Sequence, residues 1–211
     1  MKISENELYS AALKACIGAE FPRGVGEDLA RAAVALAQCD VDPLAMLVRT
    51  VELPSSEHLQ WLFQTPNWVC RNGFVSTVGP SLVDFSQLVE GSGYATAIGV
   101  ENCGLVYGCA LAVSRAAQVS FKIKFDEYDK SMFGEWVLVG DETIDSVPTE
   151  KSNVSLRCLG DANSPTTPKS SKGLNVDEGD WEALKKLAER VLVPANDENR
   201  ADAGAGNTDN D

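Results

Sequence analysis

The sequence predicts an α+β fold: an N-terminal helical segment, a small mixed β-sheet with covering helices, and a C-terminal helix with an extended acidic tail. Three patterns indicate this class. Apolar residues recur at helical spacing through 1–53, they alternate strictly in "QVSFKIKF" at 118–125, and helical spacing returns after residue 177. We expect a single domain, 1–211, built from a helical segment 1–53, a sheet-containing core 60–159, a loop or linker 160–176, and a helix and tail 177–211.

Three helices are predicted in the N-terminal segment. Ser4 with Glu7 three residues later forms a capping box, which marks the start of the first helix. "FPRGVG" then breaks the chain, and Asp42 before Pro43 marks the start of another helix. The expected helices span about 4–18, 26–38 and 43–51.

The middle of the chain changes to strand-like patterns. Asn72 and Gly73 lie between apolar runs in "PNWVCRNGFVSTVGPS", and this pair predicts a β-hairpin. A strand, helix, strand unit follows, in which Asn102 caps a long apolar helix that covers the apolar face of the next strand. The expected elements are strands at 94–100, 118–125, 135–139 and 154–158 and a helix at 103–117.

The C-terminal part combines one helix with an acidic extension. Small and polar residues from 160 to 173 indicate a surface loop, and the last helix begins near Asp177 or Asp180 with Trp181 and Leu184 on its inner face. From Asp177 onward the chain carries ten acidic and four basic residues, a net charge of −6 out of −13 for the whole chain.

Charge and composition exclude several classes of protein. A net charge of −13 repels phosphate backbones, and no basic run offsets it, so we expect no nucleic acid partner. The first residues have no signal-peptide core and the most apolar window is interrupted by Glu101, which predicts a cytoplasmic protein without a membrane span. The six cysteines are scattered without CxxC pairs, as is typical of reduced thiols.

Two segments carry a resemblance to known families. The opening "MKISENELYSAALKACIGAEFPRGVGEDLARAAVALA" and the closing "VPANDENRADAGAGNTDND" resemble a bacterial cytosolic family catalogued as a domain of unknown function, with the GAGxTDND pattern at 204–211. This resemblance implies a small soluble bacterial protein and no particular activity, cofactor or catalytic residue. The opening also resembles the helical N-terminus of malate and L-lactate dehydrogenases that lack a Rossmann fold. The His-Asp-Ser-His segment of that family is absent, because His58 is the only histidine, so its nicotinamide chemistry is not carried over.

Three residues are candidates for catalysis. His58 titrates near neutral pH and can serve as a general acid or base. Cys103 falls in the first turn of a predicted helix, where the helix dipole favours a thiolate, although Glu101 two residues away opposes it. The alternatives are an exposed histidine and a buried structural cysteine. Acids near predicted element ends, Asp84, Glu101 and Asp126, are either solvated or meet as a carboxylate pair.

The tail has three interpretations. It is an unordered acidic end, a segment that docks on the body or on a neighbouring subunit, or an oxygen-rich cluster for a hard cation. In the docking interpretation glycines allow close backbone approach and polar groups find donors, through Gly204, Gly206, Thr208, Asp209, Asn210 and Asp211. With a single histidine and no paired cysteines, we expect no metal and no cofactor.

Two functional classes follow. The catalytic inventory is thin, with one histidine, no GxSxG elbow and no phosphate loop, and this favours a non-catalytic accessory or binding module that acts as a homo-oligomer or with a protein partner. The alternative is a small-molecule metabolic enzyme whose site gathers Cys103, Glu101 and His58.

Overall fold

The structure, a computed structural model, describes residues 1–52, 61–64, 66–71, 75–89, 91–127, 135–139, 151–161 and 173–191. These residues confirm the α+β class, with six α-helices and a mixed sheet of six strands. The helices are α1 (Glu5–Gly18), α2 (Arg23–Ala37), α3 (Leu44–Glu52), α4 (Val75–Gln87), α5 (Gly104–Ala117) and α6 (Glu178–Ala188), which a 3-10 turn η1 (Glu189–Val191) continues.

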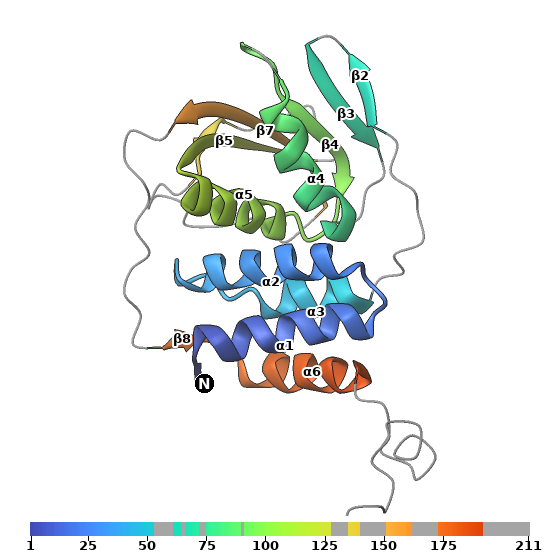
Figure 1. The fold of residues 1–211 in the computed structure, drawn as a ribbon, viewed down its shortest axis with the longest axis vertical. Coiled ribbons are helices and arrows are strands. Elements are labelled where there is room, and N and C mark those ends of the chain that lie inside the picture. The colour runs from blue at the N-terminus through green and yellow to red at the C-terminus, as the bar shows by residue number, and fades with distance from the viewer. Residues whose placement is uncertain are drawn as a thin grey trace, which may run out of the picture.

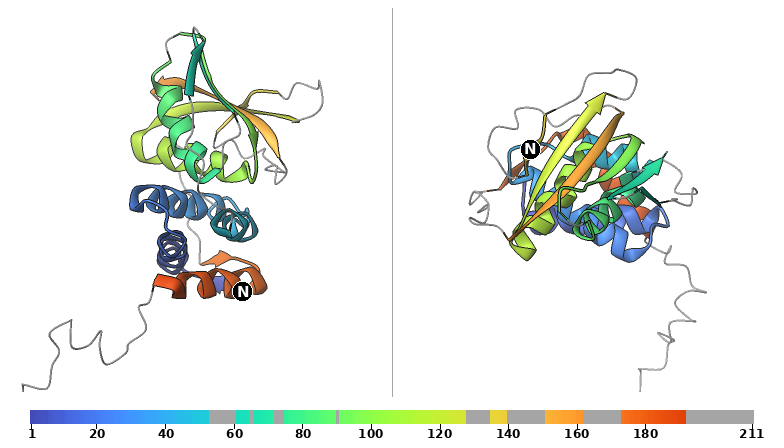
Figure 2. Two further views of the ribbon diagram at one scale, coloured as in Figure 1. Left: turned by 90° about the vertical axis from the view of Figure 1, so that its right-hand side faces the viewer. Right: turned by 90° about the horizontal axis from the view of Figure 1, so that it is seen from above.

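The elements are stacked in layers along the long axis of the molecule (Figure 1). The six-stranded sheet lies at one end, and α4 and α5 cover one of its faces, as the side view in Figure 2 also shows. Helices α2 and α3 form the next layer, and α1 and α6 close the other end. The first and last helices of the described chain are therefore neighbours in space.

The sheet has the strand order β2-β3-β4-β7-β5-β6. Only the β3–β4 pair within it is parallel, because α4 connects these two strands, and the other described pairs are antiparallel. The strands are β2 (Trp61–Gln64), β3 (Asn67–Arg71), β4 (Ala95–Val100), β5 (Val119–Glu127), β6 (Val137–Leu138) and β7 (Ser152–Asp161).

The expected hairpin around Asn72 and Gly73 is wrong. Strand β3 ends at Arg71, and residues 75–87 form α4 instead of a second strand; the hairpin present here is β2–β3, directly before it. The apolar residues Val78, Leu82 and Val83 recur at helical spacing and are buried, and this periodicity outweighs the turn signal of the Asn-Gly pair.

Most helix boundaries agree with the sequence patterns. The capping box is present, with Glu7 N donating to Ser4 Oγ at 3.2 Å and Ser4 N donating to Glu7 Oε2 at 2.7 Å. Asp42 Oδ1 accepts from Leu44 N at 2.9 Å and so caps α3. The expected cap Asn102 is an error: the N-cap of α5 is Cys103, without a side-chain bond, and Asn102 has a left-handed φ of 53°.

One buried cluster holds these layers together. It contains residues from all six helices and from the sheet, including Leu8 of α1, Leu36 of α2, Leu105 of α5 and Phe121 of β5, each fully buried. The apolar face of β5 is thus covered by α5, as the alternation predicts. Within the expected loop 160–176, Leu174–Asn175 forms β8, which pairs with β1 (Lys2–Ile3) and adds a second, two-stranded sheet.

In the part of the chain that the structure describes, no helix has both the length and the apolar character needed to cross a membrane. All six cysteines lie in this part and carry free thiols.

Candidate functional site

The expected catalytic residues are not placed as a reactive group. Cys103 is fully buried at the start of α5, and burial raises the pKa of its thiol to about 11, against the smaller opposing effect of a hydrogen bond with Ser152. The expectation that the helix terminus stabilises a thiolate is therefore wrong, because desolvation outweighs it. Glu101 is exposed, and His58 lies outside the described residues.

A cavity of about 230 Å³ lies elsewhere, among α2, α4 and α5. Its charged lining consists of Asp28 and Arg31 from α2 and Asp84 from α4. The remaining walls are small or apolar, formed by Pro80, Val83, Cys109, Ala112, Val113 and Ala116. A few charged groups converging in a mainly apolar hollow are the usual composition of a small-molecule site.

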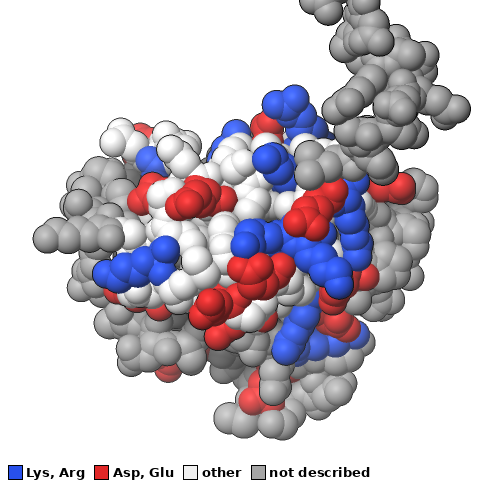
Figure 3. Space-filling view, turned by 90° about the horizontal axis from the view of Figure 1, so that it is seen from below, with Lys and Arg blue, Asp and Glu red and all other residues white. Residues whose placement is uncertain are grey.

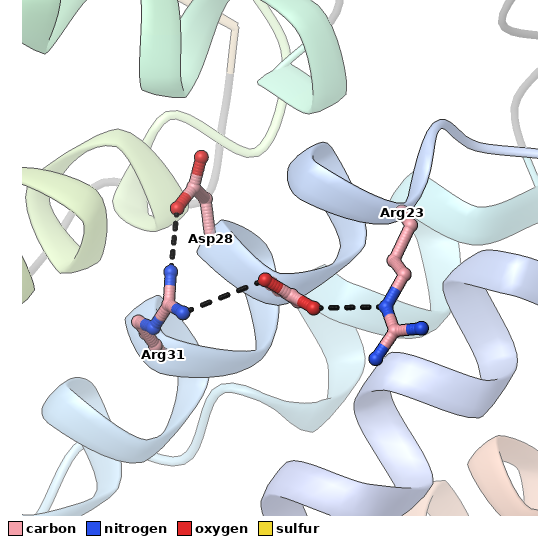
Figure 4. Close-up of polar contacts among 4 residues, drawn as sticks. Arg23, Asp28 and Arg31 are labelled. Carbon is pink, nitrogen blue, oxygen red and sulfur yellow. Dashed lines mark hydrogen bonds and ion pairs between the residues drawn. The ribbon is translucent and has the colours of Figure 1, made fainter.

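Helical spacing places Asp28 and Arg31 against each other. They lie three residues apart on α2, so their side chains share one face, and Arg31 Nη1 donates to Asp28 Oδ1 at 3.0 Å. Arg31 also pairs with Glu27 at 3.6 Å, and Glu27 accepts from Arg23 Nε at 3.0 Å. Figure 4 shows this chain of alternating charges along α2, which holds the Arg31 guanidinium between two carboxylates.

Opposing effects act on the Asp28 carboxyl. Burial raises its pKa above the usual range, Arg31 lowers it through charge and hydrogen bonding, and the charges of Asp84 and Glu27 raise it further. The net effect is a raised pKa despite the ion pair with Arg31. Asp28 is therefore a carboxyl whose protonation is shifted toward neutral pH at the edge of a cavity, which is the property of an acid-base group.

The thiol of Cys109 forms part of the wall beside this carboxyl. Burial, and next the charge of Asp28, raise the pKa of the thiol, so it stays protonated at neutral pH. Cys109 therefore serves as a small apolar surface and not as a nucleophile.

An open groove of about 500 Å³ adjoins the cavity and lies among α1, α2 and α5. Arg31, Ala112 and Ala116 line both spaces, so they form the boundary between them. The rest of the groove is lined by Glu5, Asn6, Tyr9, Val34, Ala35, Gln38 and Arg115.

The sequence carried a partial signal for this site. Asp84 is one of the acids expected to meet a second carboxylate, and its charge does act on Asp28. Asp28 and Arg31 were missed, although their i, i+3 spacing on a predicted helix indicates an ion pair. Within the described ranges no group of three or more His, Cys, Asp or Glu is placed to hold a metal ion. The tail residues 204–211 lie outside these ranges.

Comparison with known proteins gives limited support. No protein-family profile matches the chain, and no curated protein sequence is detectably similar. Three solved structures are similar in part: sulfolactate dehydrogenase from Methanocaldococcus jannaschii (10% identity, TM-score 0.48, 60% of this chain and 41% of that chain), malate dehydrogenase from Pyrococcus horikoshii OT3 (15%, 0.47, 60% and 40%) and malate dehydrogenase from Entamoeba histolytica (10%, 0.47, 78% and 50%). The chain thus spans half of their lengths or less. Because the likeness is so low, the case for a function rests on the chain's own residues.

Proposed function

We propose that the chain is a small-molecule metabolic enzyme whose ligand lies in the cavity among α2, α4 and α5, with Asp28 as the group that gives or takes a proton. The observation that carries this proposal is the raised pKa of the Asp28 carboxyl at a 230 Å³ cavity, in spite of its 3.0 Å bond from Arg31. Together with the adjoining groove, the space is in the range of small-molecule sites.

The residues divide the work of a proton transfer. Arg31 donates to Asp28 Oδ1 and so orients the carboxyl, whose other oxygen carries or accepts the proton. Asp84 is the second carboxylate of the cavity, and two acids in different environments allow one to act as the acid while the other stays ionised. The apolar walls from Val83 to Ala112 exclude water from the ligand, which strengthens these charge interactions.

The test uses a matched pair of variants. Asp28→Asn removes the titrating oxygen, and Asp40→Asn makes the same change at an exposed site with a left-handed backbone that asparagine tolerates. Purified wild-type protein is incubated with pools of small metabolites in D₂O, and deuterium incorporation or chemical change is followed by ¹H NMR. We expect any activity found to survive in Asp40→Asn and to fall by roughly 100-fold or more in Asp28→Asn. Equal turnover in both variants would refute the role of Asp28.

A non-catalytic accessory module remains the second candidate, because one surface favours it. A groove of about 470 Å³ lies between α1 and α6, with Ala11 and Trp181 in its lining and Lys14 and Lys185 beside them. Figure 3 shows this face of the molecule, where basic side chains gather among acidic ones. In this proposal the acidic segment 192–211, which follows η1 directly in sequence, docks in the groove through Gly204, Gly206, Thr208, Asp209, Asn210 and Asp211.

Trypsin tests the docking. Arg200 is the only basic residue of 192–211, so cleavage after it releases 201–211, which mass spectrometry quantifies. We expect release from the full chain to accelerate in Lys14→Glu and not in Lys186→Glu, a control on α6 outside the groove lining. Equal release from wild type and both variants would contradict docking at this groove.

The same class includes self-association. Leu62 and Phe63 are 52% and 57% exposed on β2, an edge strand of the sheet, and exposed apolar residues on an edge favour pairing with a second copy. Light scattering on the full chain measures the mass; a monomer at all concentrations would remove this part of the proposal.

A further inference from the structure

Arg115 carries a charge that no carboxylate in the described part of the chain neutralises. Its Nη1 donates to Gln38 Oε1 at 2.7 Å and to the Ala35 carbonyl at 3.4 Å, and its Nη2 donates to Cys39 Sγ at 3.3 Å. All three acceptors are formally neutral. Its Nε is buried and has no hydrogen-bond partner.

The other arginines nearby are balanced differently. Arg23 and Arg31 on α2 both pair with carboxylates, at 3.0 Å to Glu27 and 3.0 Å to Asp28. Glu5 is the one carboxylate among the residues lining the Arg115 groove, and no ion pair joins it to Arg115 within the described residues. A half-buried cation without a counter-charge is unfavourable, and a bound anion relieves this cost.

The hydrogen bonds of Arg115 also fix its position. A guanidinium has five N–H groups, and the three bonds to neutral acceptors hold the planar fork without consuming all of them. An arginine oriented in advance loses little entropy when it binds an oxyanion, and its fork matches the two oxygens of a carboxylate or phosphate group.

We propose that the groove among α1, α2 and α5 binds the oxyanion group of a small metabolite, a carboxylate or a phosphate, at the Arg115 guanidinium. This inference rests on the proposed function, since the groove shares Arg31 and Ala112 with the cavity at Asp28 and so places the other end of the ligand there. Tyr9 and Gln38 supply further polar groups along the groove.

The experiment measures binding of succinate and of inorganic phosphate to the full chain by isothermal titration, against chloride at equal ionic strength. Arg115→Gln removes the guanidinium, and Arg23→Gln removes one that lies outside the groove lining. We expect roughly tenfold or greater weakening in Arg115→Gln, in keeping with the loss of a charge-assisted hydrogen bond, and unchanged affinity in Arg23→Gln. Binding of succinate alone, or of phosphate alone, identifies which oxyanion the groove takes.

A second pair of variants avoids any effect on the bonds of Arg115. Ala116 is exposed and lines the groove, whereas Ala117 is exposed on the same helix outside the lining. Ala116→Glu places a negative charge beside the anion and is expected to abolish binding, while Ala117→Glu retains it.

The two proposals fail in different ways. Asp28→Asn is expected to leave succinate or phosphate binding within about twofold, because the anion end does not use this carboxyl. Absence of binding by wild type above the chloride baseline, or undiminished binding by Arg115→Gln, would overturn the anion site and leave the Asp28 test untouched. Loss of turnover in the absence of an anion site would in turn support Asp28 alone.

Discussion

Gly108 sets how closely α5 approaches α2, and replacing it tests the packing that forms the site. A Cβ at this position would lie 2.8 Å from the Ala32 carbonyl oxygen and 3.0 Å from Leu36 Cγ and Cδ1. Ordinary contact begins at 3.4 Å, so the Gly108→Ala methyl is about 0.6 Å too close to backbone that cannot rotate away. Helix α2 must therefore shift.

The cost follows from two opposing terms. Overpacking in a filled core costs about 1–3 kcal/mol, and the better helix propensity of alanine returns about 1 kcal/mol. We expect Gly108→Ala to lower the free energy of unfolding by about 1–2 kcal/mol. Gly24→Ala, also on α2 but with nothing within 4 Å of the added Cβ, is expected to be neutral or stabilising by up to about 1 kcal/mol.

Urea unfolding of wild type and both variants, followed by far-UV circular dichroism, measures these differences. Because Asp28 and Arg31 lie on the helix that must shift, Gly108→Ala is also expected to weaken any ligand of the cavity. Stability of Gly108→Ala equal to or above that of Gly24→Ala would refute the close α2–α5 contact and the geometry built on it.

Three further predictions concern the cap, the thiols and the pH dependence. Ser4→Ala removes the acceptor for Glu7 N and is expected to cost about 1 kcal/mol in urea unfolding; unchanged stability would show that the capping box contributes nothing. Iodoacetamide at about pH 7.5 should modify the exposed Cys39 well before the buried Cys103, whose pKa is about 11, and equal rates in peptide mass spectra would contradict this burial. The raised pKa of Asp28 means that the folded chain binds this proton more tightly than the unfolded chain. Its contribution to stability therefore falls as pH rises from about 4 through the raised pKa, and urea unfolding of Asp28→Asn across this range should lack that fall.

Local signals in the sequence predicted most of the fold. The Ser4 capping box, the Asp42 cap and the alternation at 118–125 each depend on residues close together in the chain, and the structure has them where expected. The error at α4 has a clear physical origin. An Asn-Gly pair favours a turn through its own backbone freedom, but the burial of Val78 and Leu82 at helical spacing involves more free energy than one turn.

The site was harder to predict, because its parts come from separate helices. Asp28 and Asp84 are distant in sequence, and only the crossing of α2, α4 and α5 brings their charges together. The expected thiolate at Cys103 failed for a related reason: the helix dipole is a local property, whereas the desolvation that outweighs it depends on how the layers close over the residue.

The same face of α5 explains both the tight packing and the open space. Positions 108, 109, 112, 115 and 116 follow helical spacing, and all but Arg115 carry small side chains. Where α2 approaches Gly108 the small residue lets the backbones meet, and farther along the helix Ala112 and Ala116 leave room that neither α2 nor α4 fills. Arg115, the single long side chain of this face, is held by neutral acceptors at the groove. A stripe of small residues in an apolar helix therefore indicates a close helix contact, and whether it also leaves a cavity depends on the neighbouring helices, which this stripe cannot specify.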